Sequence, residues 1–306
     1  MEDMAPVLME CFHFVLAIAM GFFLKQAGVF KKADGDVLSK VIVYITLPCA
    51  VLNGANTVHI SSLTLLMIGL AFACNLLLAG LGYLASGKAD PRTRAAYMIN
   101  AAGYNVGSVA LPFVQTFFPG AGVAYLCMFD AGNAVMGLGG IYSIADSVAC
   151  GEKRLDLKRL IRTLSKSVCF DTYMAIFVLS LFHLELPAVV RGAAEMMGKG
   201  NAFLTMLMIG IMLEVRIPRE ELRDGCVVLG LRVFVNLALG ILLYRSLPVP
   251  LLARKVLLII LACPPASVAV VFTKMCGYEK DMPAVVSSVA LAVSLVAIMG
   301  VLMVVG

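Results

Sequence analysis

The chain has 306 residues, of which 61% are apolar and only 14% are charged, and its mean hydropathy is +0.96. A soluble domain has about 45–50% apolar and about 25% charged residues, so a globular fold could not hide this much apolar surface. The composition excludes an ordinary soluble protein and predicts an all-helical integral membrane protein with almost no residues left for a soluble domain.

In chain order, the apolar stretches approach the length of about 20 residues that a membrane-crossing helix needs, and they predict ten spans. These cover residues 5–24, 38–56, 63–86, 95–118, 121–149, 167–184, 199–215, 225–245, 254–275 and 284–305. Between the sixth and seventh spans, residues 186–199 carry apolar side chains on one face and Arg191 and Glu195 on the other. This pattern is typical of an amphipathic helix at the membrane surface.

The orientation of the spans follows from the lysines and arginines, which concentrate in cytoplasmic loops. With the N-terminus outside, eighteen of the 24 basic residues fall in inner loops and five in outer loops, while Arg232 lies within the eighth span. The sequence therefore predicts a multi-pass protein of the bacterial inner membrane with both termini outside.

A basic segment at residues 151–166 divides the ten spans into two sets of five, residues 1–150 and 167–306. Because five is odd, the second set enters the membrane from the opposite side, and segment 151–166 becomes a cytoplasmic linker. Two inverted five-helix repeats are a common plan of secondary transporters.

Helix-breaking residues fall in the fourth span of each set, which favours such a repeat. The fourth span carries glycines, polar residues and a proline near its middle, and the ninth carries a proline pair; Pro112 and Pro264 are 152 positions apart. A proline interrupts helical hydrogen bonding, and the freed backbone groups must line protein or a water-filled cavity. The predicted substrate-binding residues are Asn105, Gly107, Ser108, Pro112, Pro264, Pro265 and Ser267.

The chemistry of the two breaks favours an anion, because helix N-terminal ends carry partial positive charge. No Asp, Glu, Lys or Arg occurs from Ala95 to Phe118 or from Val256 to Thr273. A carboxylate would then be held by backbone amides and by Asn105, Ser108 and Ser267. A neutral solute would fit the same polar groups, and this alternative stays open.

Other polar residues inside spans are candidates for coupling or support. Asp130, in the fifth span, is interpreted either as a proton or ion site or as the partner of Arg232, and Asn133 lies one turn on. Thr46 and Asn53 flank Pro48 in the second span and either face the substrate cavity or bond between helices.

The sequence indicates no enzyme, cofactor or metal site. The nine cysteines form no CxxC pair and no cluster with histidine, and most fit as small apolar packing residues. HExxH and GxSxG motifs are absent, and the glycines from Gly132 to Gly140 precede no phosphate-binding strand–helix unit. No nucleic-acid partner is expected either.

Several short motifs together resemble the auxin efflux carrier family of bacterial permeases, relatives of the plant PIN-FORMED auxin exporters. They are Gly28-Val-Phe-Lys-Lys with Leu38-Ser-Lys-Val-Ile-Val-Tyr-Ile-Thr-Leu-Pro48, Asn105-Val-Gly107 with Leu111-Pro112, Pro265-Ala-Ser, Met275-Cys-Gly277-Tyr and Ala284-Val-Val-Ser-Ser. Asn105 fits the crossover asparagine of the family, whereas the second crossover has only Cys263 and Ser267 beside its prolines, a departure that bears on which acids would bind.

The resemblance implies a ten-helix inverted-repeat fold in which spans one, two, six and seven form a scaffold and the other six a moving domain. It also implies that spans four and nine cross at the substrate site, that the substrates are carboxylates such as malate, malonate or indole-type acids, and that the protein is a homodimer. We thus expect a secondary transporter that lies in the membrane lipid and moves a small organic anion across the membrane by alternating access. A sodium-coupled bile-acid-type symporter and a solute sensor that does not transport remain as alternatives.

Overall fold

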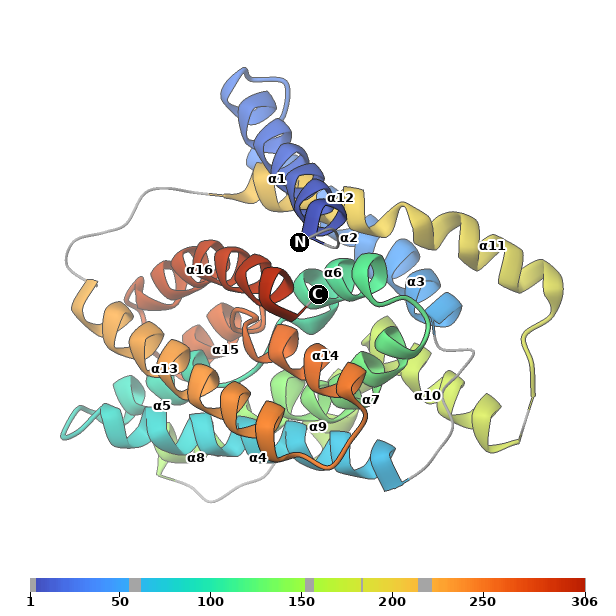
Figure 1. Ribbon diagram of the computed structural model, residues 1–306. Coiled ribbons are helices and arrows are strands. Elements are labelled where there is room, and N and C mark those ends of the chain that lie inside the picture. Colours follow the sequence, from blue (N-terminus) through green and yellow to red (C-terminus); the bar gives the residue numbers. More distant parts are fainter. Residues whose placement is uncertain (1–3, 55–61, 152–156, 183, 214–221, 306) are drawn as a thin grey trace.

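The computed structural model describes residues 4–54, 62–151, 157–182, 184–213 and 222–305 (Figure 1). Within these ranges the chain forms helices and no strand. Six helices, some continuing through a π-helical turn, are long and apolar enough to cross a membrane: Pro6–Gln26, Lys32–Asn53, Ser62–Ala85, Ala121–Cys150, Leu222–Ser246 and Met282–Val305. The prediction of an all-helical, multi-pass membrane protein is confirmed.

The first half follows the order of the predicted spans. Its helices are α1 (Met4–Gln26), α2 (Lys32–Val41), η1 (Ile42–Thr46), α3 (Leu47–Gly54), α4 (Ser62–Ala85), α5 (Pro91–Ala101), η3 (Val106–Ala110), α6 (Leu111–Phe117), α7 (Ala121–Val135), η4 (Met136–Gly140) and α8 (Ile141–Cys150). The segments η1, η3 and η4 are π-helical turns that run directly into the helix that follows each of them.

The second half contains α9 (Leu157–Leu164), α10 (Val168–Leu181), α11 (Ala188–Lys199), α12 (Asn201–Met212), α13 (Leu222–Ser246), α14 (Leu251–Leu261), α15 (Ala269–Met275) and α16 (Met282–Val305). Helix α11 is the amphipathic segment expected at residues 186–199. The expected linker at residues 151–166 contains a short helix, α9, which sequence reasoning missed; residues 152–156 of that linker lie outside the described ranges.

Two prolines inside long helices are accommodated by π-helical turns. A proline ring clashes with the carbonyl four residues before it and cannot donate to that carbonyl. The carbonyl concerned is that of Tyr44 for Pro48 and that of Ser108 for Pro112, and each lies within a π-helical turn, η1 or η3. The wider turn lets each helix continue past its proline, and such turns occur frequently at functional sites.

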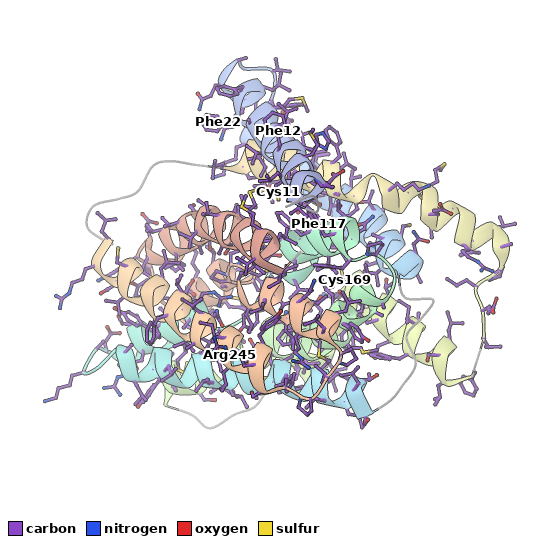
Figure 2. All side chains as sticks on the ribbon, viewed as in Figure 1. Cys11, Phe12, Phe22, Phe117, Cys169 and Arg245 are labelled. Carbon is purple, nitrogen blue, oxygen red and sulfur yellow. The ribbon has the colours of Figure 1, made fainter. Side chains whose placement is uncertain are left out.

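The helices form two groups, and α6 and α10 each contact both. In Figure 1, α1 crosses α12, with α2, α3 and α11 beside them, whereas α4, α5, α7, α8 and α13 to α16 pack together. Helices α1 and α12 approach so closely that a Cβ added to Gly210 would overlap the carbonyl oxygen of Ile18. On α6, the rings of Phe113 and Phe117 contact Phe14 of α1 at centroid distances of 4.8 and 6.2 Å. Figure 2 labels Phe117.

Candidate functional site

The fourth predicted span is interrupted between α5 and η3. Helix α5 begins at a good cap, because the Asp90 side chain accepts from the amides of Arg92 and Thr93, and Pro91 follows at the first helical position. It ends at Ala101, and Ala102 to Asn105 are not helical. Gly103 has φ +73°, in the left-handed region that favours glycine, so this residue sets the position of the break.

The ninth predicted span is interrupted between α14 and α15. Helix α14 ends at Leu261 and α15 begins at Ala269. Pro264 and Pro265 lie in the non-helical segment between them and supply two consecutive residues without a backbone N–H. The sequence correctly predicts both interruptions.

The two breaks contact each other. The backbone N–H of Asn105 donates to the carbonyl of Pro264 at 2.9 Å, and the side-chain amide of Asn105 donates to the hydroxyl of Ser267 at 3.0 Å. A Cβ on Gly103 would lie 3.4 Å from the Cβ of Ala266. Asn105 therefore joins the two interrupted helices through both its main chain and its side chain.

Arg232 of α13 supplies the donors that the ends of both helices need. Its guanidinium donates from Nη1 to the carbonyls of Ala101 at 2.6 Å and Ala102 at 3.3 Å, and from Nη2 to those of Gly103 at 2.6 Å and Cys263 at 2.9 Å. The last carbonyls of a helix have no helical partner and carry partial negative charge. One buried cation, 2% exposed, thus compensates the C-terminal ends of α5 and α14 together.

The hypothesis that Arg232 pairs with Asp130 is wrong. The carboxylate of Asp130 accepts instead from the Tyr173 hydroxyl at 2.6 Å and from the side-chain amide of Asn133 at 2.8 Å. Arg232 lies at the breaks because α13 presents it to the carbonyls of α5 and α14, and its Nη atoms donate to these carbonyls rather than to a carboxylate. Asp130, on α7, is linked through Tyr173 to α10.

Two asparagines hold the amides of the first break. The N–H of Gly103 donates to Oδ1 of Asn75 at 2.8 Å, and the N–H of Tyr104 donates to Oδ1 of Asn133 at 3.1 Å. The side chain of Asn133 also donates to the Tyr104 carbonyl at 2.9 Å. The main-chain groups of Ala102 to Asn105 are therefore paired partly with side chains from α4, α7 and α13 and partly with other backbone groups, as a break inside a membrane requires.

Tyr104 fixes the break to α13. Its hydroxyl donates to Oδ1 of Asn236 at 2.8 Å, and the guanidinium of Arg232 lies 4.9 Å from the centroid of its ring. The Tyr104 side chain is only 2% exposed, so its ring is buried where the break meets α13.

The structure gathers some predicted site residues and separates others. The breaks contain Asn105, Pro264, Pro265 and Ser267. The π-helical turn η3 contains Gly107 and Ser108, and Pro112 follows in the first turn of α6. A Cβ on Gly107 would lie 2.9 Å from the side chain of Leu47 on α3. Thr46 donates to Asn201 of α12 at 3.0 Å, so it bonds between helices as one of the two hypotheses for it held, and Asn53 is exposed on α3.

Sequence reasoning missed Asn75, Tyr104, Tyr173 and Asn236, and it gave Arg232 the wrong partner. The usable signal was the presence of Asn75, Arg232 and Asn236 inside otherwise apolar helices, because a polar residue at that depth must find a partner. Which partner it finds depends on the rotation of each helix, and the sequence does not show this rotation.

One small cavity lies beside the breaks among the described residues. It has a volume of about 10 Å³ and lies against Ala102, Gly103, Ala266 and Phe272. A single water needs roughly 10–15 Å³ by this measure, so this cavity is too small for an organic molecule.

Comparison with known proteins agrees with these features. Residues 6–154 match the family of membrane transport proteins. An uncharacterized transporter of Methanocaldococcus jannaschii is 23% identical, and the match covers 90% of this chain and 90% of that protein. The chain is thus a multi-pass membrane protein that resembles the membrane transport proteins of the auxin efflux carrier family.

Proposed function

We propose that the chain is a secondary carrier that moves a small organic anion, specifically a carboxylate, across the bacterial inner membrane by alternating access. The substrate binds at the two contacting breaks, at Asn105, Ser108, Ser267 and the amides that open η3. The observation that carries this proposal is the pair of bonds from Asn105 to Pro264 and Ser267, because it brings two interrupted helices to one place.

The electrostatics of the breaks support an anion. Arg232 compensates the negative C-terminal ends of α5 and α14, so the positive N-terminal ends are left facing the break. Helix η3 continues into α6 over residues 106–117, and the amides of its first turn, from Val106 to Ser108, donate to no carbonyl in the described part of the chain. Uncompensated amides at a helix N-terminus bind carboxylates and phosphates.

The arrangement of the helices supports alternating access. The cavity of about 10 Å³ beside the breaks is too small for an organic molecule, so binding in it requires a rearrangement. The groups α1–α3 with α11–α12, and α4–α8 with α13–α16, provide two bodies that could move relative to each other. Asp130 lies on one body and bonds to Tyr173 of α10, and α10 also contacts α3 of the other body, so its proposed role in coupling would link the two bodies through α10.

The internal spacing of polar residues supports two inverted repeats, residues 1–150 and 167–306. Asn75 and Asn236 are 161 positions apart, and so are Asn133 and Ser294. Asn75 and Asn236 lie in the third predicted span of their halves, and Asn133 and Ser294 lie in the fifth. We include in the proposal ten spans, both termini outside and a homodimer, as the family resemblance implies.

The test compares Asn105→Ala, Asn105→Asp and wild type in binding and flux. Purified protein is titrated with malate, malonate, citrate, indole-3-acetate and neutral amino acids, with and without sodium, while the unfolding temperature is followed. A ligand that binds the native state raises this temperature by mass action. We expect one carboxylate to stabilise wild type, Asn105→Ala to weaken the shift and Asn105→Asp to abolish it, with parallel losses of uptake into liposomes.

Asn53→Asp is the matched control, because it places the same charge at an exposed position of α3. It should retain wild-type binding. If sodium or a neutral solute stabilises the protein and no anion does, or if Asn105→Asp binds the carboxylate as well as wild type, the proposed anion site is wrong. Binding without flux would favour the sensor over the carrier.

A further inference from the structure

A second cavity lies outside the breaks, between α13, α14 and α16. Its volume is about 470 Å³, within the range of roughly 300–1,000 Å³ usual for small-molecule sites. Small residues, Gly240 on α13 and Ala290, Ala297 and Gly300 on α16, line it and leave room between the helices. The remaining walls are mostly aliphatic, so the cavity is an apolar groove, here named the α13–α16 groove.

Three polar side chains interrupt this apolar lining. Arg232, Asn236 and Ser294 all line the groove, and they are only 2%, 5% and 5% exposed. Arg232 uses its two Nη atoms for carbonyls, and Asn236 uses its Oδ1 for Tyr104. Nε of Arg232, Nδ2 of Asn236 and the Ser294 hydroxyl donate to no acceptor within the described residues. The lining of the groove therefore includes three unused donors, two on α13 and one on α16.

Arg232 also has no carboxylate partner in the described part of the chain. Four carbonyl dipoles solvate its charge but do not neutralise it. A buried cation without a counterion is costly, so an anion that reached Arg232 would be stabilised there. Since Asp130 is bonded to Asn133 and Tyr173, the groove is the side from which an anion can approach Arg232.

We propose that the α13–α16 groove binds a single-chain carboxylate amphiphile, a fatty acid, taken from the surrounding membrane. Its carboxylate accepts from Arg232, Asn236 and Ser294, and its chain extends along the groove towards Gly300 and Val304. Because the lipid tails of the bilayer are as apolar as the groove, the chain gains little from the transfer, and the recognition comes from the head group.

The depth of Arg232 favours a fatty acid over a phospholipid. Arg232 is ten residues from the start of α13, about 15 Å along the helix at 1.5 Å per residue, near the middle of a 25-residue span. A carboxylate on one chain can reach that depth. A phosphodiester would also have to bring a glycerol and a second chain to that depth. A fatty acid bound at Arg232 would contact a residue that also holds the two breaks together. The proposed fatty-acid site does not depend on the proposed transport function.

The test measures binding of radiolabelled palmitate to the full chain in lipid nanodiscs, with empty nanodiscs as background. Hexadecanol, which has the same tail without the charge, and acetate, which has the head without the tail, serve as competitors. Gly300→Phe fills the groove, because a Cβ there would meet nothing within 4 Å. Gly230→Phe is the matched control: it lies on α13 outside the groove and also has nothing within 4 Å.

We expect saturable palmitate binding that neither hexadecanol nor acetate displaces, that Gly300→Phe abolishes and that Gly230→Phe retains. Ser294→Ala removes one donor to the carboxylate and should weaken palmitate binding by about tenfold. This variant still tests the proposal if Gly300→Phe fails to fold. Displacement by hexadecanol at equal concentration, unchanged binding in Gly300→Phe, or no binding above empty nanodiscs would overturn the proposal.

Discussion

A single side chain, Arg232, determines how the two interrupted helices are held together. Its four carbonyl acceptors come from the ends of two helices more than 150 positions apart in the sequence. Without the guanidinium these carbonyls would be buried and unpaired, and each such group costs about 1–3 kcal/mol. The residue is therefore a structural requirement of the site before it contributes to the binding of any ligand.

Replacing Arg232 by methionine should lower the free energy of unfolding by at least about 3 kcal/mol, since the acceptors lose all their donors at once. Lysine, which keeps the charge but has no planar fork, should recover only part of this loss. Thermal unfolding in detergent micelles measures both. Arg245→Met, at the exposed end of the same helix, is the control and should change stability by less than about 1 kcal/mol (Figure 2). Equal effects at the two positions would contradict the role assigned to Arg232.

Residue chemistry alone predicted part of the site. Prolines and glycines showed where the helices would break, because their backbone restrictions are local properties of the sequence. The partner of Asp130 was not local: opposite charge favoured Arg232, but the fold places a tyrosine and an asparagine against the carboxylate. Pairings of this kind depend on how α7, α10 and α13 are rotated, which no spacing within one helix determines.

At the scale of elements, the π-helical turns and caps explain how proline-containing helices remain continuous or end. The turns η1 and η3 precede Pro48 and Pro112, whereas the proline pair after α14 ends the helix outright. The sequence predicted proline effects in the fourth and ninth spans but did not distinguish a widened turn from a break. The difference arises because Gly103, not Pro112, carries the left-handed backbone conformation of the first interruption.

The start of α5 depends on Asp90, whose carboxylate accepts from the Thr93 hydroxyl at 2.6 Å and from the amides of Arg92 and Thr93. The hydroxyl bond and then the amide bonds lower the pKa of Asp90 below its ordinary value. Asp90→Ala should cost about 1 kcal/mol of stability at neutral pH, as other cap removals do.

The pH dependence of this loss has a definite sign. Because the pKa of Asp90 is lower in the folded chain, its stabilisation is complete above the unfolded pKa of about 3.9 and disappears as the pH falls through the folded value. The difference in unfolding temperature between wild type and Asp90→Ala should therefore be constant from pH 8 to pH 5 and shrink below about pH 4. Asp36→Ala, on an exposed turn of α2, should show no loss at any pH; a matching loss there would exclude the cap as the cause.

At the scale of the whole molecule, the distribution of charge and the arrangement of the helices should agree on one orientation in the membrane. Helix α13 has 25 residues, about 37 Å at 1.5 Å per residue, enough to cross a hydrocarbon core of about 30 Å. Its first turn is preceded by basic residues assigned to the inside, so Ser246 at its other end should be outside. Cys150, at the end of α8, belongs with the basic segment on the inside.

Two native cysteines report this orientation. Cys150 and Cys226, near the start of α13, are both exposed, whereas Cys11, Cys74, Cys127, Cys263 and Cys276 are buried. In variants that keep one cysteine each, a membrane-impermeant maleimide added to intact cells should leave Cys150 and Cys226 unmodified and should label both after the membrane is opened. Ser246→Cys in a cysteine-free background should be labelled in intact cells. The reverse pattern would place both termini inside. Because α13 carries residues of both the substrate site and the fatty-acid site, it would also exchange the membrane faces from which the two ligands reach these sites.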